Sequence, residues 1–414
     1  MQAARASARA RRPRGQDMWV RVTPWTTLLA ASIAAAATYF FLRSRSRSHP
    51  DVRRRAAFDI GSGSSKVLVA DVSVATGIII GDPIYEIELP CAYKADSQQQ
   101  PDGSLSSGII EQGLAVVESL AAVALEHGAT EAHGVATEVF RTAPNGMDFL
   151  SRVAERTGVA VATISQEREA RLGLATAEAL LGGPRLVHAA WDSGGGSFQI
   201  TARGEGPQAD GAIDAVPLRT YVGKLGTGPA FHRLTTVQHK AYESTTAVNP
   251  ASAKDAAALV SVLIKELPPA PEWLQGASII AIGGWNCLFA TTLRALRSLV
   301  AAEAYTDGGD ADGAAGSFTL ADARRALSAV CGQTDEQLLV VSGSSKEAES
   351  PRFVVPKIAL LVAVASQLGL ERIRFVPATG GCAGLMALGE FTPLAALGGA
   401  SSNQSSCAQP QRHR

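Results

Sequence analysis

Two glycine- and serine-rich loops, each entered by an aspartate after an apolar run, hold the residues best suited to phosphate chemistry. They span residues 59–66 (DIGSGSSK) and 192–199 (DSGGGSFQ). Glycine lets backbone N–H groups close around a phosphate without a side chain in the way. One such loop is typical of an ordinary hairpin, but two, one in each half of the chain, predict a duplicated fold that holds a phosphate between its halves. The predicted phosphate-binding residues are Gly61, Ser62, Gly63, Ser64, Gly194, Gly195, Gly196 and Ser197.

Two further segments give the chain a family resemblance. Residues 136–146 (ATEVFRTAPNG) and 164–172 (ISQEREARL) resemble segments of the exopolyphosphatase and guanosine pentaphosphate phosphatase (Ppx/GppA) family. That family lies within the superfamily of actin, hexokinase and the sugar kinases, whose paired loops are similar to those seen here. Glycine turns at 281–284 and 378–381 resemble later turns of the family. The resemblance therefore runs through most of the chain.

The resemblance implies a chemical role for each candidate residue. Glu169, in its Glu-Ala-Arg-Leu context, is the general base, and a carboxylate with a raised pKa near phosphate suits proton removal from water. Arg141 and Lys66 bind phosphate oxygens, for which guanidinium offers a bidentate fork. Asp59 and Asp192 help to hold Mg²⁺ through water. The plainer alternatives are turn capping for the aspartates, helix-dipole compensation for Glu169 and a surface position for Arg141.

Gln199 is the one departure from the family pattern in these loops. The family's second loop usually ends in glutamate, whereas this chain has glutamine. Glutamine hydrogen-bonds a water or a phosphate oxygen, but it brings no negative charge to a metal and cannot act as a base. We count Gln199 with Glu169 among the catalytic candidates and expect activity to persist, because the other site residues remain.

These residues together predict a Mg²⁺-dependent phosphoanhydride hydrolase, which must hold a terminal phosphoryl group and aim a water at it. The leading expectation is an exopolyphosphatase that releases orthophosphate from inorganic polyphosphate. Guanosine pentaphosphate presents the same terminal anhydride and is the alternative substrate. The Glu-Ala-Arg-Leu segment argues against a sugar or acetate kinase. A weakly active or non-catalytic membrane-tethered sensor of polyphosphate or nucleotide is favoured only by Gln199.

Alternating strand-like and helix-like patterns predict an α/β fold. The resemblance implies that this α/β fold consists of two ribonuclease H-like (actin-like ATPase) domains with a phosphate-binding cleft between them. We expect domain I over residues 56–185, domain II over 186–397 and a disordered polar tail over 398–414. Apolar spacing predicts helices at 111–127, 148–157, 167–181, 251–266, 320–330 and 357–368, a buried strand at 186–190, and loops at 94–107 and 305–316.

Residues 1–55 differ from the rest of the chain. Residues 22–42 carry no charge and are long enough for one membrane-spanning helix, whereas a cleaved secretory signal has a shorter apolar core. Residues 1–16 are rich in Arg, Ala and Ser and lack acids, which resembles an organelle transit peptide. We therefore expect a single-pass membrane protein, in the mitochondrion or another organelle. Arginines on both sides of the apolar stretch leave its orientation open.

The composition narrows the range of partners. The net charge is +0, so no overall field attracts nucleic acid, and a polyanion must be recognised by a local patch. The 5 cysteines are dispersed along 414 residues, which argues against a disulfide framework or a zinc site. The expected partners are inorganic polyphosphate or a guanosine polyphosphate and, through residues 22–42, a membrane. The sequence leaves a homodimer open.

Overall fold

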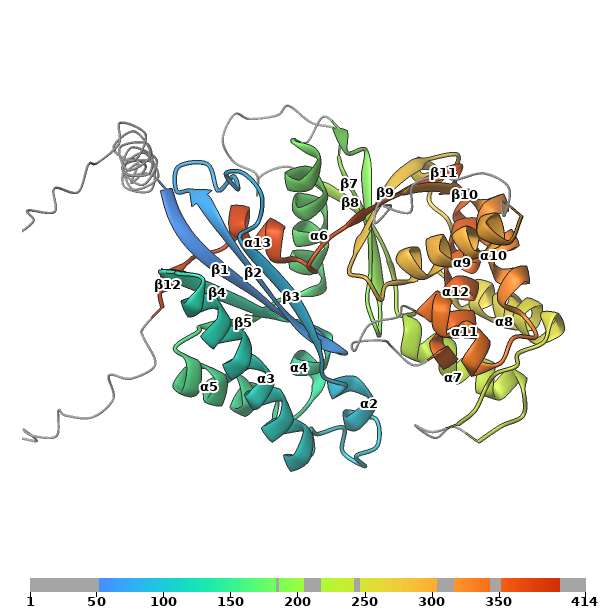
Figure 1. Ribbon diagram of the computed structural model, residues 1–414, viewed down its shortest axis with the longest axis horizontal. Helices are drawn as coiled ribbons and strands as arrows, with labels where there is room; N and C mark the ends of the chain where they lie inside the picture. The colour runs from blue at the N-terminus through green and yellow to red at the C-terminus, as the bar shows by residue number, and fades with distance from the viewer. Residues whose placement is uncertain are drawn as a thin grey trace, which may run out of the picture. The chain divides into compact units, whose positions relative to one another are not determined.

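The computed structural model of the protein describes residues 52–183, 186–204, 217–241, 246–303, 316–342 and 351–394. The predicted membrane anchor, the predicted tail and nearly all of the predicted loop at 305–316 lie outside the described residues. The described residues from Val52 onward belong to one compact unit. This unit is an α/β fold built on two sheets (Figure 1), which confirms the α/β part of the predicted fold class.

The first sheet has the strand order β12-β4-β1-β2-β3, with β5 beside β4. Strands β1, β2 and β3 form antiparallel hairpins, whereas β4 and β5 join in parallel after helical crossovers. Helices α3 (Ser107–Glu126) and α5 (Gly146–Thr157) pack against each other over this sheet (Figure 1). The strands are β1 (Val52–Ile60), β2 (Ser64–Ser73), β3 (Tyr85–Pro90), β4 (Glu131–Ala136), β5 (Val161–Thr163) and β12 (Thr392–Pro393).

The second sheet has the order β10-β11-β9-β6-β7-β8 and repeats the hairpin pattern of the first, because β6, β7 and β8 are antiparallel neighbours. Its first strand begins at Ala189, so the prediction of a buried strand at 186–190 was partly wrong: Leu186 and His188 are exposed. The strands are β6 (Ala189–Ser193), β7 (Phe198–Arg203), β8 (Leu218–Gly223), β9 (Ser278–Gly283), β10 (Gly316–Thr319) and β11 (Arg372–Pro377).

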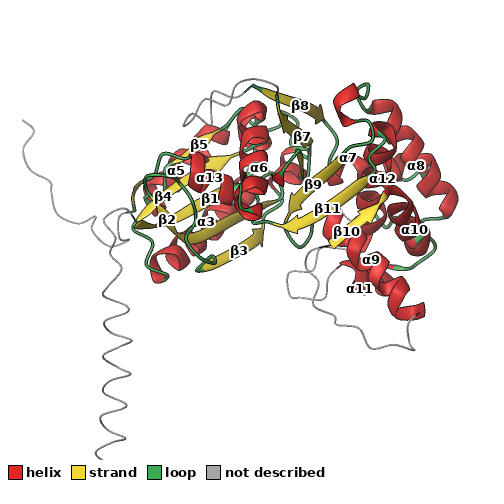
Figure 2. Cartoon of the chain, turned by 90° about the horizontal axis from the view of Figure 1, so that it is seen from above, coloured by secondary structure: helices red, strands yellow, loops and turns green. Residues whose placement is uncertain are grey.

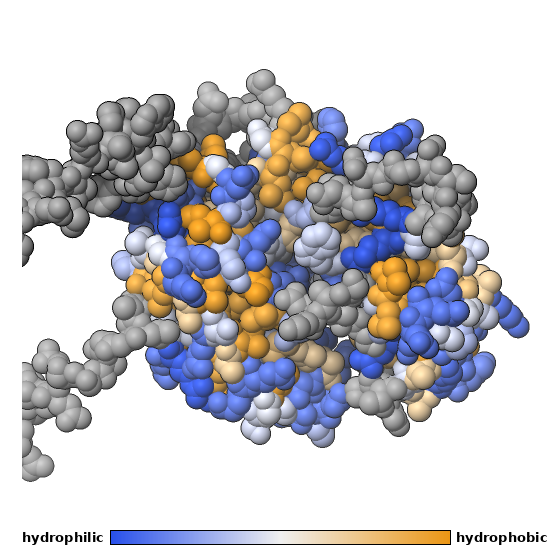
Figure 3. Space-filling view, in the orientation of Figure 1, coloured by the Kyte–Doolittle hydropathy of each residue, from blue (hydrophilic) through white to orange (hydrophobic). Residues whose placement is uncertain are grey.

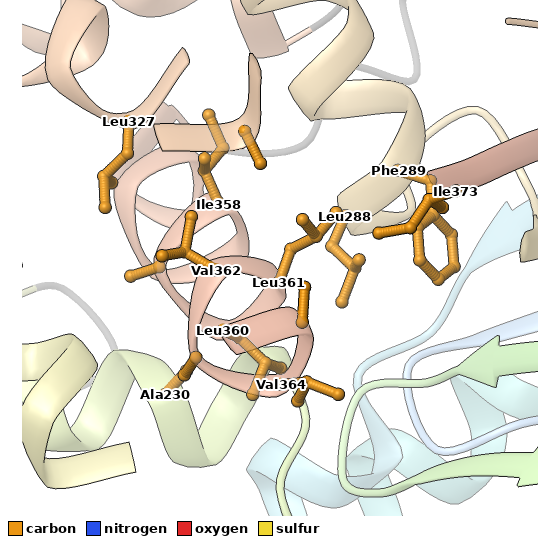
Figure 4. Packing of buried hydrophobic residues seen from close by; sticks show 14 of the residues in the cluster. Ala230, Leu288, Phe289, Leu327, Ile358, Leu360, Leu361, Val362, Val364 and Ile373 are labelled. Atoms are coloured by element: carbon orange, nitrogen blue, oxygen red, sulfur yellow. The ribbon is translucent and has the colours of Figure 1, made fainter. Parts of the chain in front are cut away.

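Helix α12 (Val354–Leu368) is the centre of the core beside the second sheet. It packs against five other helices, and almost all of its residues are buried. Figure 4 shows Ile358, Leu361 and Val362 of this helix surrounded by apolar side chains of its neighbours. A helix that is apolar all round is expected to be buried in this way. The surrounding helices are α7 (Thr227–Val237), α8 (Ala253–Glu266), α9 (Leu288–Glu303), α10 (Leu320–Val330) and α11 (Asp335–Ser342).

Two described helical stretches, Ser107–Glu126 and Pro351–Leu368, are long and apolar enough to cross a membrane by length and composition alone. Both pack against other elements of the fold, and core helices of globular domains pass the same test. These two helices are therefore part of the α/β fold.

On the face drawn in Figure 3, hydrophilic areas alternate with smaller hydrophobic patches over the described residues.

Helices α6 (Gln166–Leu181) and α13 (Cys382–Leu388) lie between the two sheets (Figures 1 and 2). Leu172 of α6 packs with residues of the first sheet, whereas Leu174 packs with residues of the second. Strand β12 then pairs with β4 of the first sheet. The C-terminal end of predicted domain II, from Cys382 to Pro393, therefore packs with the first sheet.

Several elements were not predicted. The expected loop at 94–107 contains most of helix α2 (Tyr93–Ser97), and helix α4 (Glu138–Thr142) follows β4 directly. Strand β8 and helices α7, α9 and α11 were also missed. Helices α2 and α4 are only one turn or so long, and their packing against each other supplies stability that local sequence does not reveal.

Candidate active site

The two glycine loops are turns of the same construction. The Gly61 N–H donates to the carbonyl of Ser64 at 2.8 Å, and the Gly194 N–H donates to the carbonyl of Ser197 at 2.9 Å. In each hairpin an aspartate faces a polar residue across the strands: Asp59 pairs with Lys66, and Asp192 pairs with Gln199. The duplication seen in the sequence thus extends to backbone register, and Gln199 occupies the position that Lys66 has in the first hairpin.

The second loop is supported by the start of helix α7. The Gly228 N–H donates to the carbonyl of Gly195 at 2.9 Å. A Cβ atom at Gly226 would lie 2.5 Å from the carbonyl carbon and oxygen of Gly195. Because backbone atoms cannot move aside as a flexible side chain can, only glycine permits this approach.

Asp59 and Asp192 end the strands that lead into the two loops. Asp59 is 8% exposed, and its Oδ2 accepts the Gly381 N–H at 2.8 Å, so the glycine turn at 378–381 belongs to the site. Asp192 packs against α6, where a Cβ at Gly173 would lie 3.3 Å from the Asp192 Cβ. Burial, followed by repulsion from Asp59, raises the pKa of Asp192 to about 6. The two aspartates are thus close enough to interact electrostatically.

Glu169 and Arg141 form an ion pair beside these aspartates. The Arg141 Nη1 lies 3.3 Å from the Glu169 Oε2 and also donates to the carbonyl of Ile164. Burial and repulsion from Asp192 raise the pKa of Glu169 to about 7, although Arg141 acts in the opposite direction. A carboxyl group with this pKa can accept a proton near neutral pH. The side chains are 23% and 18% exposed, so solvent still reaches both.

Glu88 of β3 organises the polar side chains of the first loop. It accepts the Ser64 hydroxyl at 2.6 Å and lies 3.7 Å from the Lys66 Nζ, which also donates to Ser64 at 2.9 Å. Burial opposes the charge on Lys66, but Glu88, Asp59 and Asp192 together raise the pKa of Lys66. The Ser64 hydroxyl, which we predicted to contact phosphate, donates to a carboxylate in this structure.

Gln199 lies on β7 and is only 3% exposed. Its side-chain amide donates to the hydroxyl of Ser197 at 3.5 Å. Gln199 therefore lies beside the second loop, through its place in β7, and adds no charge there. Its proposed catalytic role stays a prediction.

Glu138 is a site residue that the sequence analysis did not single out. It is the first residue of α4 and accepts the Ser62 hydroxyl at 3.2 Å and the Lys94 ammonium at 2.5 Å. A Cβ at Gly196 would lie 2.9 Å from the Glu138 Oε2, so this carboxylate touches both loops. Its position in the motif at 136–146, three residues before Arg141, was the available signal.

The two aspartates fit a hydrated divalent cation. A cation near Asp59 and Asp192 would relieve the repulsion that raises the pKa of Asp192. Within the described ranges, no three His, Cys, Asp or Glu side chains form a metal cage. Mg²⁺ keeps several waters and needs only one or two protein carboxylates, so a cage is not required. Asp59 and Asp192 are therefore the residues that would hold Mg²⁺.

The fold and the site together define a class: a two-sheet α/β protein in which two aspartate-led glycine hairpins face an acidic helix start. Comparison with known proteins identifies a family segment and a shared fold. Residues 93–209 match the model of the Ppx/GppA phosphatase family. The crystal structure of the Ppx/GppA family member from Aquifex aeolicus matches 81% of this chain and 97% of its own, with a TM-score of 0.55 and 18% sequence identity. The predicted resemblance is thus confirmed: residues 93–209 carry a Ppx/GppA segment, and the chain has the same fold as the Aquifex aeolicus family member.

Curated relatives match a shorter part of the chain. An uncharacterized protein of Streptomyces coelicolor is 28% identical over 166 residues, which is 40% of this chain and 47% of that protein. Exopolyphosphatase 1 of Mycobacterium tuberculosis is 25% identical over 151 residues, which is 36% of this chain and 42% of that protein. The chain thus aligns with less than half the length of these relatives.

Proposed function

We propose that this protein is a phosphoanhydride hydrolase that removes the terminal phosphoryl group of inorganic polyphosphate. The observation that carries the proposal is the Glu169–Arg141 pair, in which a base with a pKa of about 7 touches a guanidinium near both aspartates. The matched Ppx/GppA segment at 93–209, which contains both residues, supports the same reading. The choice of polyphosphate as substrate follows the name of a relative, Exopolyphosphatase 1 of Mycobacterium tuberculosis.

In the proposed reaction, Glu169 takes a proton from a water as the water oxygen bonds to the terminal phosphorus. The bond from that phosphorus to the bridging oxygen breaks, and the shortened chain leaves with the bridging oxygen. Both contacts that Arg141 makes with the described residues use Nη1, so Nη2 and Nε can donate to phosphoryl oxygens. Mg²⁺ held by Asp59 and Asp192 would neutralise charge on the phosphates.

Guanosine pentaphosphate is the alternative substrate, because it ends in the same anhydride. The third possibility is a membrane-tethered sensor with little or no turnover. Gln199 favours it, because the second loop then lacks the carboxylate that the family usually has at this position. Orthophosphate release from the two substrates by residues 52–414, with and without Mg²⁺, separates the three. Release from polyphosphate alone supports the leading reading, and release from neither supports the sensor.

We further propose that residues 22–42 tether the hydrolase to an organelle membrane. The support comes from the uncharged 21-residue length of that segment. Carbonate extraction of membranes from cells that express the full chain tests the proposal. A protein released into the soluble fraction would refute it.

A further inference from the structure

The carboxylate of Glu138 lies where the two glycine loops approach each other. It accepts a hydrogen bond from Ser62 of the first loop and lies against Gly196 of the second. Its partner Lys94 belongs to α2, whose backbone is tied to the first loop, because the Lys94 N–H donates to the carbonyl of Ser62 at 2.9 Å. A buried structural role does not account for the pair, since Glu138 and Lys94 side chains are 26% and 28% exposed.

A carboxylate at this position has a physical consequence for any phosphate. Two anions separated by a few ångström in a partly desolvated site repel strongly, whereas a lysine between them compensates. Glu138 therefore occupies the same kind of site as a phosphoryl oxygen: it takes a hydroxyl donor and an ammonium donor that an incoming phosphate would use.

We propose that Glu138 and Lys94 are specificity-determining residues of the phosphate site: Lys94 contacts the bound phosphate, and Glu138 competes with that phosphate for Lys94 and Ser62. This inference rests on the proposed function for its biological meaning, because competition by Glu138 favours release of the product orthophosphate. A polyphosphate chain with many charges outcompetes a single carboxylate more easily than orthophosphate does.

The direction in which one substitution changes the affinity for orthophosphate distinguishes this role from a structural one. Glu138→Gln keeps a side chain that can accept from Ser62 but removes the repelling charge, so orthophosphate should bind about tenfold more tightly. Lys94→Met removes the compensating charge and should weaken orthophosphate binding about tenfold. The double variant should return close to wild type, since the two changes offset each other.

The test is calorimetric titration of the full-length protein with inorganic phosphate, with the thermal unfolding midpoint measured for each variant. Glu111→Gln is the matched control, because Glu111 is an ion-paired glutamate of α3 that contacts Arg152 and Arg156 on α5. The inference is overturned if Glu138→Gln leaves orthophosphate binding unchanged or weaker, if Glu111→Gln tightens binding equally, or if the wild type binds no orthophosphate. Titration is independent of turnover, so a wild type without phosphatase activity that still shows the expected changes refutes the hydrolase and supports this binding role.

Discussion

Replacing Arg141 with methionine should move the acid limb of the pH–rate profile to higher pH. A general base works when deprotonated, so activity is present above the pKa of Glu169 and is lost as the pH falls through about 7. Arg141 lowers that pKa through its 3.3 Å contact, and an opposite charge at this range shifts a carboxyl by roughly one to three pH units. Because both side chains are partly exposed, we take the lower limit, roughly one unit.

The magnitude follows from this shift. At pH near 7 the deprotonated fraction of Glu169 falls from about one half to about one tenth, a roughly fivefold loss that higher pH restores. A second loss, about 2 kcal/mol, persists at every pH because the charge-assisted contact of Arg141 with phosphoryl oxygens is gone. Arg141→Lys should keep the limb near its original position, because the charge remains, yet lose rate, because an ammonium lacks the planar fork.

The assay is kcat/KM for orthophosphate release across the range from acidic to alkaline pH. Arg171→Met is the control: Arg171 lies on the same helix as Glu169 but pairs with Glu167 at 3.6 Å. An acid limb that stays near pH 7 in Arg141→Met would refute the proposed coupling. A limb that moves equally in Arg171→Met would show that the effect is not specific to the Arg141 contact.

Three further outcomes are expected. Gln199→Glu should raise activity or Mg²⁺ affinity by restoring a carboxylate opposite Asp192, as measured by the Mg²⁺ concentration for half-maximal rate; a markedly less active variant would count against this. Removing residues 1–51 should give a soluble protein with intact hydrolysis, because β1 begins at Val52, and a truncated protein that still sediments with membranes would contradict a single anchor. Gly226→Ala should cost about 1–3 kcal/mol in the free energy of unfolding, because its Cβ would meet the Gly195 backbone. Gly228→Ala, whose Cβ would lie 3.3 Å from the same carbonyl oxygen, should be milder.

The sequence was most informative where local pattern and chemistry coincide. The paired Asp–glycine loops predicted the duplicated hairpins, and apolar spacing predicted the long helices α3, α6 and α12. From the sequence, only the direction of the pKa shift of Glu169 could be predicted. One cause of that shift is repulsion from Asp192, which is 23 residues away in the chain. The resemblance placed these residues in one site, and the structure supplied the contacts among them.

The rest depended on tertiary packing. The start of strand β6 was predicted too early because Leu186 and His188 look apolar or neutral in the chain, yet both are exposed and precede the strand. The return of α13 to the first sheet was invisible because its short apolar pattern fits either half. Glu138 was overlooked because a glutamate at a helix start is ordinarily a favourable partner of the helix dipole. Only the approach of Ser62 and Gly196 shows that it belongs to the site.

The most direct test of the central claim is orthophosphate release from inorganic polyphosphate by the wild type and by Glu169→Gln, at neutral pH with Mg²⁺. We expect the wild type to release orthophosphate, and Glu169→Gln to be slower by about two to four orders of magnitude, because a general base contributes on that scale. Polyphosphate affinity should change little. A wild type that releases no orthophosphate from polyphosphate or guanosine pentaphosphate, or a Glu169→Gln variant that works at wild-type rates, would contradict the account.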